Sequence, residues 1–476
     1  MKVLGRRALM TALVLAMVLA CGALAFADEA GNEYGVMIDG EYVTFTDAAP
    51  QNVEGRIMVP FRAIFESLGA EVEYAAETRT VTAALGAKTI SFDVGGSEIL
   101  IEEDGASQTR AMDVVPFIDE ASDRTYVPTR FIAEALGFVV GWDAEAKTAV
   151  VIDPAMFDGL NEELGILSLM FQQNTDMEQV YAGQGSITLE GQMDMNQLAI
   201  LQLGQAAEED QGSISISMDG SISGMQQGNN ADLDLVMPLV MSVTAEGQTI
   251  DTEMDLSMKT KLDGETMTLY LQCPLYAQMG MLEEGAWLKM DMQAFYEDMG
   301  MDVTQLMELA GSGADLEVEA LLAEMLSLYA DSFTVSTYQE IQSLTEVLVD
   351  CLGDEAFVQT SSGGYTVYTA EFESPSVEGV ALDGSLVIRA RGEVFADFDL
   401  EMNLSMEDSF NVALQARGSA LTAEMSFSVI EGDAVNFVME MSLELEEAEG
   451  TVEYQIPADA QVVDYMEWME SMLTEE

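Results

Sequence analysis

The sequence contains no histidine, and this absence narrows the chemistry available to the chain. Histidine is the general base of the usual catalytic triads and a ligand of catalytic zinc, so triads, zincin motifs and most transition-metal sites are excluded. The nucleophile elbow, the phosphate-binding loop and the dinucleotide fingerprint are missing as well. Paired carboxylates carry no signal, because 85 acidic residues make any spacing available by chance. We therefore expect no catalytic residue, no metal site and no cofactor.

Basic residues are also scarce. There are 17 of them against 85 acidic residues, which gives a net charge of -68. Such a chain cannot neutralise phosphates, so nucleic acid is excluded as a partner, and anionic lipid head groups repel it unless cations screen the charge. Apolar residues make up 49% of the 476 residues, enough to fill the cores of two or three domains. The composition is typical of a soluble protein in a salty or crowded exterior.

The N-terminal segment has the layout of a secretion signal. A positive start is followed by an apolar stretch over residues 8–24, and Ala25-Phe26-Ala27 places small residues at both positions that a signal peptidase reads. We predict a signal peptide over residues 1–27 and a secreted or extracellular, envelope-associated protein. The alternative is lipoprotein processing with lipidation at Cys21, which would anchor the protein to a membrane. No later run is long enough for a transmembrane segment.

Two cysteines remain after this leader, Cys273 and Cys351. An exported chain with two cysteines permits one disulfide. Two free thiols that behave as small apolar side chains are the alternative. The sequence leaves this choice open.

A repeat with a spacing of 68 residues (124 minus 56) is the clearest internal pattern. Residues 56–62, R-I-M-V-P-F-R, return at 124–130 as R-T-Y-V-P-T-R, and E-S-L-G at 66–69 returns at 134–137 as E-A-L-G. Each unit predicts a strand, a helix and a hairpin, with proline at the strand end and glycine as a left-handed helix cap. The structural positions of the repeat are Pro60, Arg62, Gly69, Tyr74, Pro128, Arg130, Gly137 and Trp142. We predict that Trp142 belongs to the core.

Together these motifs resemble the copper amine oxidase N-terminal-like domain, or stalk domain, of exported bacterial proteins. The resemblance covers residues 35–153. It implies a small antiparallel sheet wrapped on helices and an accessory role at the cell surface, where a wall or surface component is the partner. Copper chemistry is not implied, because the catalysis of that enzyme resides in another domain and this chain has no histidine.

The rest of the chain, residues 158–476, is predicted to form a large β-rich domain. Residues 156–181 have helical spacing, and beyond Gly185 apolar and polar residues alternate, which predicts an antiparallel sheet with one dry face and one wet face. We expect about ten strands, with hairpin turns at Asp263-Gly264 and Asp383-Gly384. Helices are predicted over 292–309, 316–329, 338–352 and 458–473, and the first three are expected to cover the dry face. The fold class is therefore α+β, a small duplicated module followed by a large antiparallel meander or half-barrel with inserted helices.

This order of elements resembles the LolA/LppX-like half-barrel of exported lipoproteins, with Trp287-Leu288-Lys289-Met290-Asp291 before the helical insert. Methionine is abundant, with 34 residues. Thioethers also suit Cu(I), but methionines that alternate with polar residues line the dry face of a sheet. The candidates for lining an apolar ligand site are Met193, Met195, Met218, Leu400, Met402, Met439 and Met441. On the wet face, the pairs Asp232/Asp234 and Asp397/Asp399 are candidates for loose Ca²⁺ capture, without an EF-hand spacing.

Two functions fit these observations. The first is an exported, non-catalytic protein that holds a lipid or another apolar small molecule in its C-terminal domain. The second is a structural or adhesive envelope scaffold without a small-molecule ligand.

Overall fold

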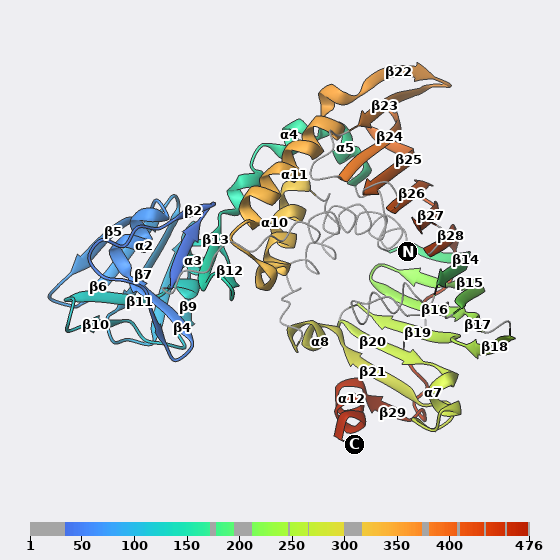
Figure 1. Cartoon of the computed structure of the whole chain (residues 1–476), viewed down its shortest axis with the longest axis horizontal. Coiled ribbons are helices and arrows are strands. Elements are labelled where there is room, and N and C mark those ends of the chain that lie inside the picture. The colour runs from blue at the N-terminus through green and yellow to red at the C-terminus, as the bar shows by residue number, and fades with distance from the viewer. Residues whose placement is uncertain are drawn as a thin grey trace. The chain divides into compact units, whose positions relative to one another are not determined.

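A computed structural model describes residues 34–171, 178–194, 212–245, 248–264, 266–298, 317–373, 380–406, 410–432, 435–452 and 455–474 (Figure 1). The predicted signal peptide with Cys21, and the ligand candidate Met195, lie outside these residues. The described chain divides into two compact units. The N-terminal unit comprises residues 34–160 and 319–346, and the C-terminal unit comprises the described parts of 161–318 and 347–474. Both units combine helices with a larger share of strands, which confirms the predicted α+β class.

The N-terminal unit contains the predicted repeat of strand, helix and hairpin. In the first copy these elements are β4 (Arg56–Pro60), α2 (Phe61–Ser67), β5 (Glu71–Ala75) and β6 (Thr80–Leu85). In the second copy they are β11 (Arg124–Pro128), α3 (Thr129–Leu136), β12 (Val139–Asp143) and β13 (Thr148–Ile152). The remaining strands are β1 (Gly35–Ile38), β2 (Glu41–Tyr42), β3 (Gln51–Val53), β7 (Lys88–Asp93), β8 (Glu98–Glu103), β9 (Ala106–Ala111) and β10 (Phe117–Asp119). They form three sheets with the orders β12-β13-β1-β2, β10-β11-β4-β3 and β5-β6-β7-β8-β9.

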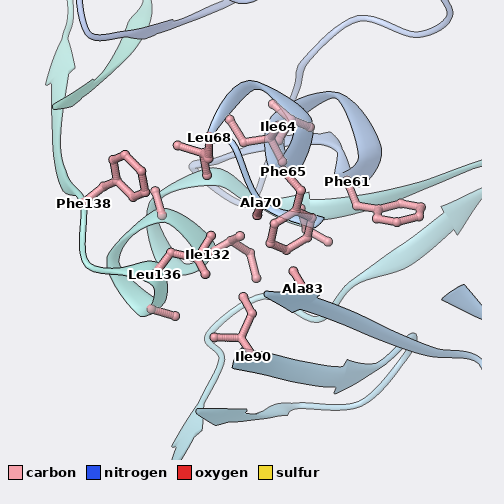
Figure 2. Packing of buried hydrophobic residues seen from close by; sticks show 14 of the residues in the cluster. Phe61, Ile64, Phe65, Leu68, Ala70, Ala83, Ile90, Ile132, Leu136 and Phe138 are labelled. Carbon is pink, nitrogen blue, oxygen red and sulfur yellow. The ribbon is translucent and has the colours of Figure 1, made fainter. Parts of the chain in front are cut away.

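Both helices of the repeat begin and end as the sequence predicts. Pro60 and Pro128 precede the first helical residue, where the missing N–H has no helical partner to lose. Gly69 and Gly137 follow the helices with φ of 76° and 103°, values that glycine adopts without steric cost. Figure 2 shows the consequence of this geometry, because apolar side chains of α2 and α3 converge on those of β6 and β7 and close one core.

The C-terminal unit is built on one sheet of sixteen strands, where the sequence predicted about ten. Its main path runs β22-β23-β24-β25-β26-β27-β28-β14-β15-β16-β19-β20-β21-β29, and β17 joins β15 to β18 beside this path (Figure 1). All pairings are antiparallel except that of β21 with β29. The bounds are β14 (Val180–Asp194), β15 (Ser213–Gln227), β16 (Asn230–Val236), β17 (Pro238–Ala245), β18 (Gln248–Asp255), β19 (Met258–Asp263), β20 (Thr268–Gln272), β21 (Trp287–Asp291), β22 (Val358–Ser362), β23 (Tyr365–Glu373), β24 (Val380–Arg391), β25 (Val394–Met406), β26 (Phe410–Ser419), β27 (Thr422–Glu431), β28 (Val435–Ala448) and β29 (Val462–Asp464).

The continuous helix predicted over residues 156–181 is wrong. This stretch forms the short helices η1 (Pro154–Phe157), α4 (Leu160–Glu163), α5 (Gly165–Ser168) and η2 (Leu169–Phe171), and β14 has begun by Val180. Gly159, with φ of 93°, leaves the helical region, and the carboxylate of Asp354 accepts a hydrogen bond from the N–H of Ile166 at 2.7 Å. A tertiary contact therefore starts a new helical turn where the apolar spacing predicted continuity.

The other helices of the described chain are α7 (Pro274–Gln278), α8 (Met292–Asp298), α10 (Val318–Leu328), η3 (Ala330–Ser332), α11 (Thr337–Leu352), η4 (Asp354–Ala356) and α12 (Tyr465–Thr474). The predicted helices over 316–329 and 338–352 are confirmed as α10 and α11. Residues 319–346 belong to the N-terminal unit, and residues 347–352 at the end of α11 belong to the C-terminal unit. None of the helices in the described ranges is long and apolar enough to span a membrane.

Asp383-Gly384 is not a hairpin turn, which corrects a second prediction. Both residues lie inside β24, where Gly384 pairs with Phe372 on one side and Met402 on the other. A Cβ atom at position 384 would come within 2.7 Å of the Phe372 ring. The same Cβ would come within 2.2 Å of the Glu401 carbonyl oxygen, so the glycine is required by the close approach of this backbone atom and of the aromatic ring rather than by a turn.

Cys273 and Cys351 are free thiols, so the disulfide alternative does not hold in this structure. Cys273 follows β20, near one end of the strand order, whereas Cys351 precedes β22 at the opposite end. Burial raises the pKa of the Cys351 thiol, as expected for a thiol packed as an apolar side chain.

Candidate ligand-binding face

The register of the large sheet sorts its side chains into the two predicted faces. Residues directly opposite each other on neighbouring strands share a face. By this criterion Met193, Met218, Leu400, Met402, Met439 and Met441 all lie on the dry face. The sequence therefore placed every described candidate on the same side of the sheet.

One end of the dry face is covered by short helices. η2 lies against β25, and η4 lies against β23. Leu386, Leu400 and Leu414 on the strands of this end are only 1%, 2% and 4% exposed. Leu400 is therefore a core residue beneath this cover and not part of an accessible surface.

Beyond this covered end, the dry face carries one row of apolar side chains across six consecutive strands. Each member lies directly opposite the next, and all six are partly exposed. In order they are Phe427 on β27, Met439 on β28, Leu189 on β14, Met218 on β15, Leu239 on β17 and Met254 on β18. We call this set the apolar row.

Glycines flatten the dry face where aromatic rings lie on it. Phe437 pairs with Gly191, and a Cβ on that glycine would come within 3.0 Å of the ring. The same relationship joins Phe398 to Gly418, at 3.0 Å, and Phe372 to Gly384. A ring that lies over a cross-strand glycine does not project from the sheet. Phe398 and Phe372 are buried in the covered core, whereas the partly exposed Phe437 next to Met439 makes the surface beside the apolar row shallow and apolar.

The wet face is acidic, and each carboxylate of its proposed Ca²⁺ positions forms an ion pair with a basic side chain. Arg389 forms ion pairs with Asp397 at 2.5 Å and Asp399 at 2.8 Å. On the other strands, Asp232 pairs with Lys261 at 2.7 Å and Asp234 with Lys259 at 3.9 Å. Within the described residues there is no group of three or more side chains that could hold a metal ion. Loose Ca²⁺ capture by these four carboxylates is therefore not supported.

The aromatic and arginine positions of the N-terminal repeat play unequal roles. Trp142 is partly buried against the module core, and its ring lies 6.4 Å from that of Tyr34. Tyr74, its equivalent, is 37% exposed and contacts Phe61. Arg62 pairs with Glu66 on its own helix at 3.9 Å, and its guanidinium lies 5.7 Å from the centre of the Phe61 ring. Arg130, the equivalent of Arg62, instead pairs with Asp331 of η3 at 3.6 Å.

Arg130 belongs to the surface of the second repeat that contacts residues 330–339, the segment from η3 to the start of α11. A Cβ on Gly141 would come within 2.2 Å of the Ala330 carbonyl oxygen and 2.4 Å of the Phe333 Cβ. The carboxylate of Asp143 accepts a hydrogen bond from the N–H of Val335 at 3.1 Å. We call this contact the β12 clasp. The first repeat has the exposed Glu73 at the position equivalent to Gly141, so the two copies have diverged at this surface.

Several members of the apolar row were not predicted as site residues, namely Phe427, Leu189, Leu239 and Met254. The alternation pattern marks each of them as apolar and inward-facing, but only the strand register places them beside one another. No signal in the sequence fixes that register, because two of the five pairings, β28 with β14 and β15 with β17, are between strands that are not consecutive in the chain.

Comparison with known proteins bears on the N-terminal module. Residues 37–151 match the family model of the copper amine oxidase N-terminal domain, which confirms the resemblance found in the repeat. In that enzyme the N-terminal domain is not the catalytic one. No curated protein sequence matches the chain.

Solved structures give only weak similarities. OpdQ of Pseudomonas aeruginosa is similar over 53% of this chain and 52% of its own, at 6% identity and a TM-score of 0.10. This chain therefore spans about half the length of OpdQ. The translocator domain of autotransporter NalP from Neisseria meningitidis is similar over 62% of this chain and 96% of its own, at 8% identity and a TM-score of 0.13. Scores this low carry no argument about fold or function, and the LolA/LppX-like resemblance stays a prediction.

Proposed function

We propose that this chain is an exported, non-catalytic binding protein that holds a lipid or another apolar molecule on the dry face of its large sheet. The observation that carries the proposal is the apolar row, which continues beyond the helical cover with all six side chains partly exposed. Apolar surface of this kind gains free energy when another apolar body removes it from water.

The composition of the row supports a ligand rather than a fixed internal partner. Three of its six members are methionines, and Met441 and Met425 flank it on the next row. Methionine is flexible and polarizable, so it adapts to guests of different shapes and specifies a single packing poorly. The charge of -68 keeps the acidic wet face solvated.

Mass spectrometry of a lipid extract of the purified full-length protein tests the proposal. We expect a co-purifying apolar molecule and, after its extraction, uptake of the uncharged fluorescent probe N-phenyl-1-naphthylamine. Met439→Gln and Met441→Gln should each weaken uptake about tenfold, because a polar amide replaces a contact worth on the order of 1–2 kcal/mol. Glu440→Gln is the matched control, because residue 440 lies between these two methionines on the wet face.

An extract without lipid, together with no probe uptake, would overturn the proposal. It would favour the second function, a structural or adhesive envelope scaffold, in which the dry face is closed by the chain itself. Equal effects of Met439→Gln and Glu440→Gln would also contradict the assignment of the site to the dry face.

A further inference from the structure

The geometry of the apolar row points to a more specific ligand, and this inference rests on the proposed function. We infer that the row holds an extended aliphatic chain of roughly 16–18 carbons, whose uncharged or cationic head group lies at β18. The length of the row sets the number of carbons, because an extended chain with carbon–carbon bonds of about 1.5 Å advances about 1.25 Å per methylene.

The length follows from the strand spacing. The row crosses five gaps between neighbouring strands, from Phe427 to Met254, and each gap is about 4.8 Å, so the row is about 24 Å long. An extended aliphatic chain of about 18 carbons spans a similar length, at about 1.25 Å per methylene. A chain laid across the strands therefore contacts every member of the row.

The two ends of the row differ, which orients the chain. Beyond Phe427 the next residue across the sheet is Leu414, which is 4% exposed and belongs to the covered core. At the other end Met254 lies on β18, which pairs with β17 alone among the strands that the structure describes. Ile250 on this strand is 68% exposed, the largest value among the exposed apolar side chains. The aliphatic tail therefore points toward β27, and the head group emerges at β18.

The charge at β18 selects the head group. Asp251, Glu253 and Asp255 are exposed on the wet face of this strand, opposite to Met254 and Ile250, and β17 and β18 contain no lysine or arginine. Hydrogen bonds from Ser257 lower the pKa of Asp255, so its carboxylate stays ionised at neutral pH. Because β18 lies at an edge of the described sheet, a carboxylate or phosphate head group that leaves the row there lies within about a Debye length, roughly 10 Å, of these three negative charges on the other face. An alcohol or an ammonium group meets no such repulsion.

Competition against bound N-phenyl-1-naphthylamine tests the chain length on the full-length protein. The probes are alkyltrimethylammonium ions, 1-alkanols and fatty acids with 10 to 22 carbons. We expect affinity to rise about fourfold for each methylene and to level off at about 16–18 carbons. In Met439→Trp the larger side chain should block the part of the row on β28 and β27, which is two strand widths long, so the affinity should level off at a chain about eight carbons shorter. Glu440→Trp, on the opposite face, should leave the length at which affinity levels off unchanged.

The head group is tested in the same assay. At equal chain length we expect ammonium ions and alcohols to bind more tightly than fatty acids, by about tenfold at low salt and much less in 1 M NaCl. The triple variant Asp251→Asn, Glu253→Gln, Asp255→Asn should remove this preference without moving the plateau. Because its substitutions lie on an exposed edge strand, a melting curve suffices to show that it folds.

The possible outcomes separate the two proposals. If the wild-type protein takes up no probe, the proposed function fails and the inference fails with it. If the probe binds but affinity has no plateau, or levels off at the same length in Met439→Trp and Glu440→Trp, the dry face binds apolar molecules in another way and only the inference is overturned. Tighter binding of fatty acids than of alcohols overturns the head-group assignment.

Discussion

Val59 of the first repeat lies directly opposite Val127, its equivalent in the second repeat, in the antiparallel pair of β4 and β11. The neighbouring pairs are symmetric too, because Met58 faces Pro128 and Pro60 faces Tyr126. An antiparallel pair centred on equivalent residues relates the two copies by a local two-fold axis. The duplication therefore builds its own interface, as in an isologous dimer fused into one chain.

This symmetry predicts equal costs for equivalent substitutions. Both valines are fully buried, so Val59→Ala and Val127→Ala should each lower the free energy of unfolding by about 2 kcal/mol. The double variant should deviate from additivity, because the two residues are in direct contact. Denaturant unfolding of the full chain measures all three, with the exposed Val115→Ala as a control near zero. A strongly unequal pair would argue against the shared interface.

Trp142→Ala should destabilise the N-terminal unit by about 2 kcal/mol, less than for a fully buried tryptophan because the side chain is only partly buried. Tyr74→Ala, at the equivalent but more exposed position, should cost less. Calorimetric melting of both variants checks the order. An unchanged melting temperature for Trp142→Ala would contradict its assignment to the core.

The β12 clasp predicts a sharp steric effect at Gly141. Gly141→Val should displace residues 330–339, because its Cβ would meet the Ala330 carbonyl oxygen and the Phe333 side chain. Amide hydrogen exchange over 330–340 should then accelerate, while exchange in β24–β28 stays slow. Glu73→Val is the matched control, because it introduces the same side chain at the equivalent exposed position of the first repeat. Unchanged protection in Gly141→Val would show that the segment does not depend on this contact.

Crossed ion pairs between the repeats predict a pH dependence. Arg56 hydrogen-bonds to Asp113 at 2.5 Å, and Arg124 to Asp47 at 2.8 Å, so each arginine pairs with an aspartate that precedes the other copy. These hydrogen bonds lower the pKa of both aspartates. A lowered folded-state pKa gives stability that is present above the unfolded value, about 3.9, and is lost as the pH falls through the folded value.

Arg56→Met and Arg124→Met should therefore lower the melting temperature slightly at pH 6 and have no effect at pH 2. Both pairs are exposed, so the effect should be small and should shrink in 1 M salt. Arg62→Met, whose ion pair stays within one helix, serves as the comparison. A difference from wild type that persists at pH 2 would mean that the arginines act through packing rather than charge.

Local patterns in the sequence determined much of this protein. The 68-residue repeat specified strand, helix and hairpin twice, because proline and glycine fix backbone angles through their own covalent structure. Alternation specified the two faces of the large sheet, because side chains on a strand point to opposite sides with a period of two. The class α+β and the grouping of the methionine candidates on one face followed from these two rules.

Only the tertiary structure decided how these pieces combine. Glycine is compatible with both a turn and a strand, and at Gly384 the close contact with the Phe372 ring on the neighbouring strand selects the strand. The apolar row depends on strand register over six strands, and register is set by long-range pairing that no local pattern encodes. The grouping of residues 319–346 with the N-terminal unit likewise depends on Gly141 and Asp143, nearly two hundred positions earlier in the chain, where Asp143 meets Val335 at a separation of 192 residues. Contacts between residues so distant in sequence are fixed by shape and charge complementarity in three dimensions, which is why the sequence alone did not predict them.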